Sequence, residues 1–417
     1  MPPRLLPVLY FAWAHLSLAA ACVLLLMRPE EAAGFFYSPR LVAVVHLVTV
    51  GWITSSILGA IYIVGPMAMK MALPAGKLDY AAFACAVIGS NGMVSHFWLE
   101  RYDGMAWSAG LLLLGILHVG VRVVRASIGA RIQAAVKLHL ALAFINLLSA
   151  GGAGILLGID RSHQVLPGGG LSWVYAHAHL AALGWAVMMV MGAGYRLFPM
   201  VLPSAMAPEG GMWAGAILLQ AGAAGLFATF ALQRGGGWIF ALLTLGAFAA
   251  FASRMIWMMR NKRRLPPGFP RPDLGTLQAL SALAFGVAAL LIGLALSLMP
   301  SSEASLRLAP VYGVLGLLGF LSQMVVGIGA RLLPMFAAGH AVFDAPPGTQ
   351  VIRPHQMPDR RLQAVTLAAW LAAVALLAAG MWLPSSAVIA TGAGLLLTGV
   401  IAGGLNDWIV LQYAWRK

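Results

Sequence analysis

The sequence predicts an all-α, polytopic membrane protein of about twelve transmembrane helices, built as three pseudo-threefold four-helix repeats. Three observations predict this fold: the composition, the apolar segments and a recurring residue pattern. Of the 417 residues, 61% are hydrophobic and only 9% are charged. A water-soluble globular protein carries far more charge on its surface, so the composition excludes that class and makes the lipid bilayer the solvent of this chain.

Twelve apolar segments are each long enough to cross a bilayer, which takes about 20 helical residues. The first segment is too long and too uninterrupted for a typical cleaved signal peptide, so it is expected to remain as a helix. The segments lie near residues 5–27, 40–66, 78–97, 105–121, 138–159, 171–198, 211–231, 237–258, 275–299, 307–333, 362–383 and 386–413.

The Lys and Arg residues are distributed unevenly over the connecting loops. Cytoplasmic loops retain positive charge, and the bias is strong if both termini are cytoplasmic. Only six of the 26 basic residues then lie on the outer side: Arg28, Arg40, Arg101, Arg161, Arg234 and Arg307. We therefore predict a multi-pass protein of the bacterial inner membrane with both termini in the cytoplasm. The net charge of +14 is spread over short loops, which indicates topology and lipid contact rather than nucleic-acid binding.

A residue pattern recurs three times along the chain, starting at His46, His179 and Val314. The first two copies have Gly, Trp, Gly, Tyr, Pro and Met at offsets +5, +6, +13, +16, +20 and +21, and the third has Gly, Phe, Gly, Ala, Pro and Met. The starting residues are 133 and 135 positions apart, which corresponds to four helices per repeat.

This period predicts how the chain is organised. A single membrane domain, residues 1–417, is expected to contain repeats at about 1–133, 134–267 and 268–417, related by rotation about the membrane normal. At 100° per residue, the offsets +5, +13, +16 and +20 fall on one stripe of a helix. Small residues in such a stripe favour close helix packing.

Three histidines lie at matching depth in these repeat-related helices: His46 in the second segment, and His177 and His179 in the sixth. An ionisable side chain inside a span is costly unless it is partnered or functional, and imidazole is a good ligand for heme iron. The recurrence of histidine before the same glycine pattern therefore favours a heme site. Residues 177 and 179 are about 200° apart around a helix, so their rings are expected to point to different neighbours.

The other ionisable residues within the spans give weaker signals. His118 and His139 lie near helix ends, where capping or interfacial roles are expected. His15 stands alone in the first segment and receives no function. Asp407 is the only acidic residue clearly within a span, so proton pumping is not expected.

The segment from Trp173 to Pro199, with its His-Ala-His motif, resembles the HxH helix of heme-copper oxidase subunit I, nearest the cbb3-type oxidases and related nitric oxide reductases. The resemblance at residue level covers two helices, and the twelve-helix pseudo-threefold ring extends it to the architecture. It implies one or two b-type hemes, with His177 on a high-spin heme, and His179 with His46 on a low-spin heme. It also implies redox chemistry on oxygen or nitric oxide, with electrons from cytochrome c, a quinol or another donor subunit.

The chain departs from the family pattern in the place of its HxH motif. The family has this motif in the tenth helix, whereas here the tenth segment has Tyr312 and Val314 at the aligned positions. The sites would then be rotated by one repeat, and His46 would face His177 rather than His179. Both pairings stay open.

This chain also has no full counterpart of the family's copper site. That site needs three histidines, two of them adjacent, and this chain has no adjacent pair. A rotated copper site would draw on His46 and His96. The competing class is a heme protein without catalysis that transfers electrons or senses or resists nitric oxide, as the twelve-helix NnrS family is thought to do. Three parallel repeats argue against a transporter, which typically has inverted repeats or two halves.

Overall fold

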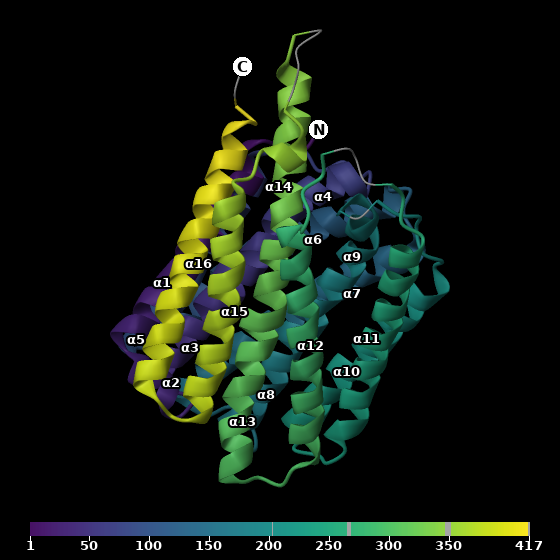
Figure 1. The fold of residues 1–417 in the computed structure, drawn as a ribbon. Helices are drawn as coiled ribbons and strands as arrows, with labels where there is room; N and C mark the ends of the chain where they lie inside the picture. The colour runs from purple at the N-terminus through teal and green to yellow at the C-terminus, as the bar shows by residue number, and fades with distance from the viewer. Residues whose placement is uncertain (202, 265–267, 347–351, 416–417) are drawn as a thin grey trace. The chain divides into compact units, whose positions relative to one another are not determined.

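The computed structural model describes residues 1–201, 203–264, 268–346 and 352–415 (Figure 1). Twelve helices in these ranges are long and apolar enough to cross a membrane, which confirms the predicted all-α polytopic fold. They are Leu5–Met27 (α1), Pro39–Ala68 (α3, Pro39–His46; η1, Leu47–Thr54; α4, Ser55–Ala68), Lys77–Leu99 (α5), Met105–Gly129 (α6), Ala134–His163 (α7), Gly170–Met200 (α8, Gly170–His179; η2, Leu180–Val187; most of α9, Met188–Val201), Gly210–Ala231 (α10), Gly237–Arg260 (α11), Leu274–Leu298 (α12), Glu303–Asp344 (α13, Glu303–Val314; η3, Leu315–Ser322; α14, Gln323–Asp344), Arg360–Trp382 (α15) and Ser386–Gln412 (α16).

Most helix ends lie within a few residues of the apolar segments, but two helices are clearly longer. The α6 helix continues to Gly129 and α14 continues to Asp344. Apolar composition marks only the part of a helix that lies in hydrocarbon, and backbone hydrogen bonds extend the helix beyond it. Two short elements, α2 (Pro29–Ala33) and η4 (Pro354–Gln356), lie between the spans.

The second helix of each proposed repeat contains an eight-residue π-helix: η1, η2 or η3. Each π-helix begins at the residue directly after a pattern start, that is, after His46, His179 or Val314. The three π-helices are therefore spaced along the chain at the same intervals as the three copies of the residue pattern. Because π-helices are rare and often mark functional sites, their recurrence supports the repeat and draws attention to these three positions.

The glycine stripe packs the second helix of each proposed repeat against the first helix of the same proposed repeat. A Cβ added at any of these glycines would lie between 2.5 and 2.9 Å from the nearest atom of that neighbouring helix. Such distances require a glycine, as the packing interpretation of the stripe predicts. The +5 pairs are Gly51 with Ser17, Gly184 with Asn146, and Gly319 with Phe285; the +13 pairs are Gly59 with Tyr10, Gly192 with His139, and Gly327 with Ala279.

The stripe allows a direct stability test on α14. In Gly327→Ala the new Cβ would meet the backbone nitrogen of Ala279 at 2.8 Å, which we expect to destabilise the protein by about 1–2 kcal/mol through overpacking. A Cβ on Gly339 meets no described atom within 4 Å, so Gly339→Ala is expected to be neutral or slightly stabilising, as alanine favours a helix. Thermal unfolding in detergent measures both, and equal midpoints for the two variants would contradict tight packing at the stripe.

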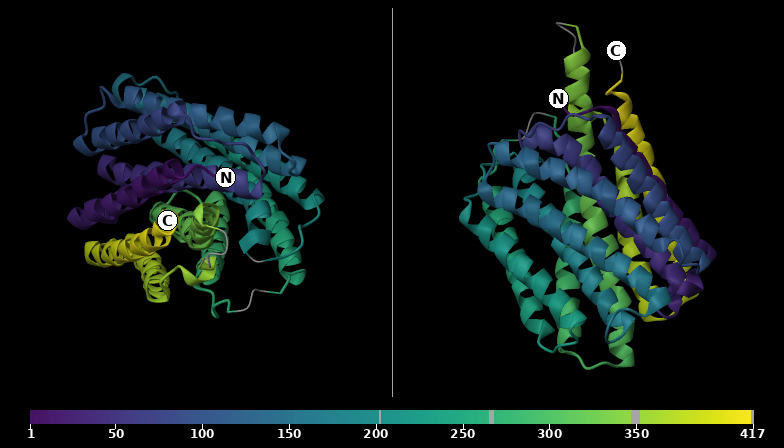
Figure 2. Two further views of the ribbon diagram at one scale, coloured as in Figure 1. Left: turned by 90° about the horizontal axis from the view of Figure 1, so that it is seen from above. Right: turned by 180° about the vertical axis from the view of Figure 1, so that it is seen from behind.

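By their internal contacts, the residues form two compact units. The first unit comprises Met1–Ile63, Pro266–Ile292 and Pro300–Lys417, and the second comprises Val64–Leu265 and Gly293–Met299. In the first unit α16 packs against both α15 and α1, so the last membrane helix lies beside the first (Figures 1 and 2). In the second unit α10 pairs with α11 and α5 pairs with α6, while α7 packs against α8, η2 and α9.

Candidate functional site

His46 is the last residue of α3 and directly precedes η1 in the first unit. Its Nδ1 lies 2.8 Å from the carbonyl oxygen of Val42, one helical turn earlier. Because a carbonyl oxygen only accepts hydrogen bonds, Nδ1 carries the proton and the lone pair of the neutral imidazole is on Nε2. Metal-binding histidines commonly use this arrangement, in which a backbone carbonyl fixes both the tautomer and the ring orientation.

His177 and His179, in the second unit, have the same tautomer. The Nδ1 of His177 lies 2.8 Å from the carbonyl oxygen of Ala150 on α7, and the Nδ1 of His179 lies 2.8 Å from that of Tyr175. Each imidazole is half-buried. The lone pair of each neutral ring is therefore on Nε2.

The two rings of the His-Ala-His motif point toward different helices. His177 contacts α7, where a Cβ added to Gly154 would lie 3.1 Å from its Cε1, so this glycine leaves room for the ring. The ring of His179 packs against Phe230 on α10, with 5.0 Å between centroids. The expectation that the rings diverge is confirmed. His46 belongs to the other compact unit. Which of His177 and His179 shares a heme with it therefore stays a prediction.

His96, the candidate copper ligand, lies in the last turn of α5. Its Nδ1 is 2.6 Å from the carbonyl oxygen of Arg101, and a Cβ added to Gly104 would lie 2.5 Å from its Nε2. These contacts hold the turn between α5 and α6, which gives His96 a structural role. In the described ranges no group of three or more His, Cys, Asp or Glu side chains is placed to hold a metal ion. The copper site therefore stays a prediction.

His139 does not have the interfacial role expected from its place near a helix end. Its side chain is completely buried, and its ring stands edge-on to that of Tyr195, with 5.5 Å between centroids. Position in the chain gave the wrong answer because Gly192, on the neighbouring helix, allows α7 to approach closely at this residue. His139 therefore belongs to the interior packing of the second unit.

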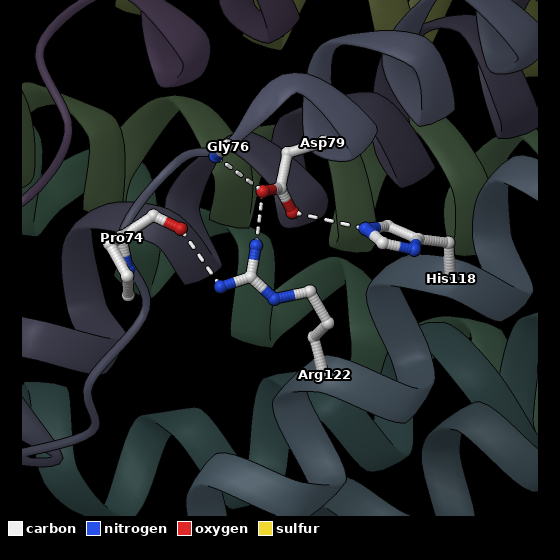
Figure 3. A network of polar contacts seen from close by, with 5 residues as sticks. All are labelled: Pro74, Gly76, Asp79, His118 and Arg122. Carbon is white, nitrogen blue, oxygen red and sulfur yellow. Dashed lines mark hydrogen bonds and ion pairs between the residues drawn. The ribbon is translucent and has the colours of Figure 1, made fainter.

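His118 does lie in a polar network, which joins α5, α6 and the loop before α5 (Figure 3). The carboxylate of Asp79 is only 1% exposed and accepts hydrogen bonds from the guanidinium of Arg122 and, at 2.7 Å, from the backbone N–H of Gly76. The Nε2 of His118 lies 3.3 Å from the same carboxylate, and Arg122 also donates to the carbonyl of Pro74 at 2.8 Å. The network gives His118 a contact with α5, and the capping or interfacial role expected for it stays a prediction.

The structure also pairs two residues that sequence reasoning treated separately. The Nε2 of His15 on α1 lies 3.6 Å from the Oδ2 of Asp407 on α16. A signal for this pair was present, because each side chain is an isolated ionisable group within an apolar span. What was missing was the adjacency of α1 and α16, which are far apart in the sequence.

Comparisons with other proteins add no family assignment. No known protein-family pattern matches the chain, and no curated protein sequence matches it either. The likeness to heme-copper oxidases therefore rests on the His-Ala-His helix and on the twelve-helix repeat, and the function that it implies is a proposal.

Proposed function

We propose that this protein is a membrane-embedded b-type heme protein in which His46, His177 and His179 would hold the heme iron. The observation that carries the proposal is their shared geometry, in which a backbone carbonyl 2.8 Å away holds Nδ1 and the lone pair is on Nε2. Two of the three, His46 and His179, also stand directly before a π-helix at repeat-related positions. His15 has the same type of hydrogen bond at 2.9 Å but precedes no π-helix, which makes it a matched control.

The residues present fit a heme. Imidazole is a common axial ligand, and a fixed tautomer preorganises it for iron. Gly154 provides space beside the ring of His177 that a larger residue would fill. Because His177 and His179 face different helices, one helix can supply imidazoles to two sites.

When bound, heme supplies a one-electron redox couple and, where one axial position is open, a binding site for oxygen or nitric oxide. His46 and one imidazole of the His-Ala-His motif would hold a heme that transfers electrons. The other imidazole would hold a heme that binds the gas. The electron donor would be cytochrome c, a quinol or another subunit. The second candidate function is electron transfer or nitric oxide sensing without catalysis, and the diverging rings suit it equally.

Absorption spectroscopy of the protein purified in detergent tests this proposal. We expect a Soret band, b-type bands in the reduced-minus-oxidised spectrum, and one or two iron atoms per chain by metal analysis. Carbon monoxide binding would support the gas-binding site, and low-spin bands without carbon monoxide binding would support the electron-transfer alternative. Absence of a Soret band after expression with ample heme would overturn the proposal.

The distribution of Lys and Arg supports a location in the bacterial inner membrane with cytoplasmic termini. Arg416 and Lys417 contribute to this bias but lie outside the described residues. Fusing a periplasm-active reporter to the C-terminus tests the orientation. We expect an inactive reporter there, and an active one at the loop containing Arg234.

A further inference from the structure

The first unit contains a cavity of about 50 Å³ that is lined by α1, η1, α12, α14, α15 and α16. Most of its wall is apolar, and two indoles, those of Trp52 and Trp370, form part of it. His15 and Asp407 line the same cavity, with 3.6 Å between Nε2 and Oδ2. A volume of this size holds about three water molecules. The site thus combines an acid, a base and room for water within apolar helices.

His15 is oriented for proton exchange through Nε2. Its Nδ1 donates to the carbonyl oxygen of Phe11 at 2.9 Å, so Nε2 is the nitrogen that gains or loses a proton. A Cβ added to Gly404 on α16 would lie 3.3 Å from Cδ2 of His15, so this glycine makes room for the imidazole. The separation of 3.6 Å from Asp407 is too long for a direct hydrogen bond. A water molecule or a small side-chain movement therefore completes the connection.

The indole of Trp52 supplies an independent sign that a polar ligand enters this cavity. Trp52 is only 3% exposed, and its Nε1 has no hydrogen-bond partner among the described residues. A buried donor without a partner is costly, and a cavity water would satisfy it. Hydrogen-bonding side chains on three other helices also line the cavity, namely Gln278, Gln363, Thr366 and Asn406.

The charge balance of the pair favours holding one proton between the two groups. A net charge in an apolar interior is costly. With a single shared proton, both possible states, imidazolium with carboxylate and imidazole with carboxylic acid, are neutral overall. His15 and Asp407 are the only ionisable residues among those lining the cavity. The nearby Arg331 follows the lining residue Ala330 on α14 and is paired with Asp273.

We propose that His15 and Asp407 form a membrane-embedded proton-binding site that exchanges its proton with water in the cavity. In one exchange the Oδ2–H bond of Asp407 breaks and its proton passes to a cavity water, while that water gives another proton to Nε2 of His15. The number of protons and the net charge are unchanged, and positive charge moves across the 3.6 Å between the two groups. The reverse transfer resets the pair. This site uses none of the proposed heme ligands and does not depend on heme binding.

Infrared spectroscopy of the full-length protein with carboxyl-¹³C-labelled aspartate tests the proposal. We expect a carbonyl-stretch band from a protonated aspartate that shifts on transfer to D₂O. This band should be absent from Asp407→Asn, which preserves the shape of the side chain, and present in Asp103→Asn, which changes an exposed carboxylate. A band that is retained in Asp407→Asn, or that does not shift in D₂O, would overturn the proposal.

A second measurement tests the role of His15 without removing the carboxylate. The pH dependence of the labelled band should change in His15→Gln, because the imidazole that shares the proton is gone. It should be unchanged in His163→Gln, which replaces an exposed histidine at the C-terminal end of α7. Identical titration curves for the wild type and His15→Gln would show that Asp407 acts alone. This comparison remains informative even if Asp407→Asn fails to fold.

Discussion

Replacing His46, His177 or His179 by alanine is expected to remove part of the heme spectrum, and the part that is lost identifies the heme that each residue holds. His46→Ala should abolish the low-spin bands, because that heme would lose one of the histidines that would hold it. If His179 is the partner of His46, His179→Ala should have the same effect and His177→Ala should instead abolish carbon monoxide binding. If His177 is the partner, these two results are exchanged. The spectra of the three variants thus decide between the pairings.

His15→Ala serves as the matched control for these variants. Its imidazole also hydrogen-bonds through Nδ1 to a carbonyl one turn earlier and also lies within an apolar helix. We expect its heme spectrum and iron content to equal those of the wild type. Added imidazole should restore the low-spin bands in His46→Gly, which a purely structural role would not explain. Unchanged heme content and spectra in all three ligand variants would rule out this ligand set.

Removing the charge of Asp79 is expected to cause the largest loss of stability. Its carboxylate is almost fully buried and neutralises Arg122, so Asp79→Asn leaves a half-buried guanidinium without its counter-charge. Breaking a buried ion pair in this way costs about 3–5 kcal/mol. We expect the lower end of that range, because Arg122 is 27% exposed and water partly replaces the lost contact. Thermal or denaturant unfolding of the purified protein measures the effect.

Two further variants separate the contributions of Asp79. Asp79→Ala also removes the acceptor for the N–H of Gly76, which caps α5, so it should be less stable than Asp79→Asn by about 1 kcal/mol. Asp103→Asn changes an exposed carboxylate and should stay within about 0.5 kcal/mol of the wild type. An Asp79→Asn variant as stable as Asp103→Asn would mean that the network in Figure 3 contributes nothing to stability.

Much of the fold was predictable from local properties of the sequence. Every membrane helix could be placed because a span must be apolar over a length set by the bilayer. The close contacts at Gly51, Gly184 and Gly319 followed from a repeated stripe of small residues. The divergence of His177 and His179 followed from helix geometry alone, since two residues separated by one position lie on opposite sides of a helix.

The sequence by itself therefore determined the class of protein, its twelve spans and the two helices that carry the three candidate heme ligands. Only the tertiary structure decided which side chains meet. The pattern of apolar residues does not show which helices, far apart in the sequence, contact each other. It therefore could not pair His15 with Asp407 or place His139 in the interior. The π-helices after His46 and His179 were equally invisible, because their residues are as apolar as those of an ordinary span and only the backbone hydrogen bonds distinguish them.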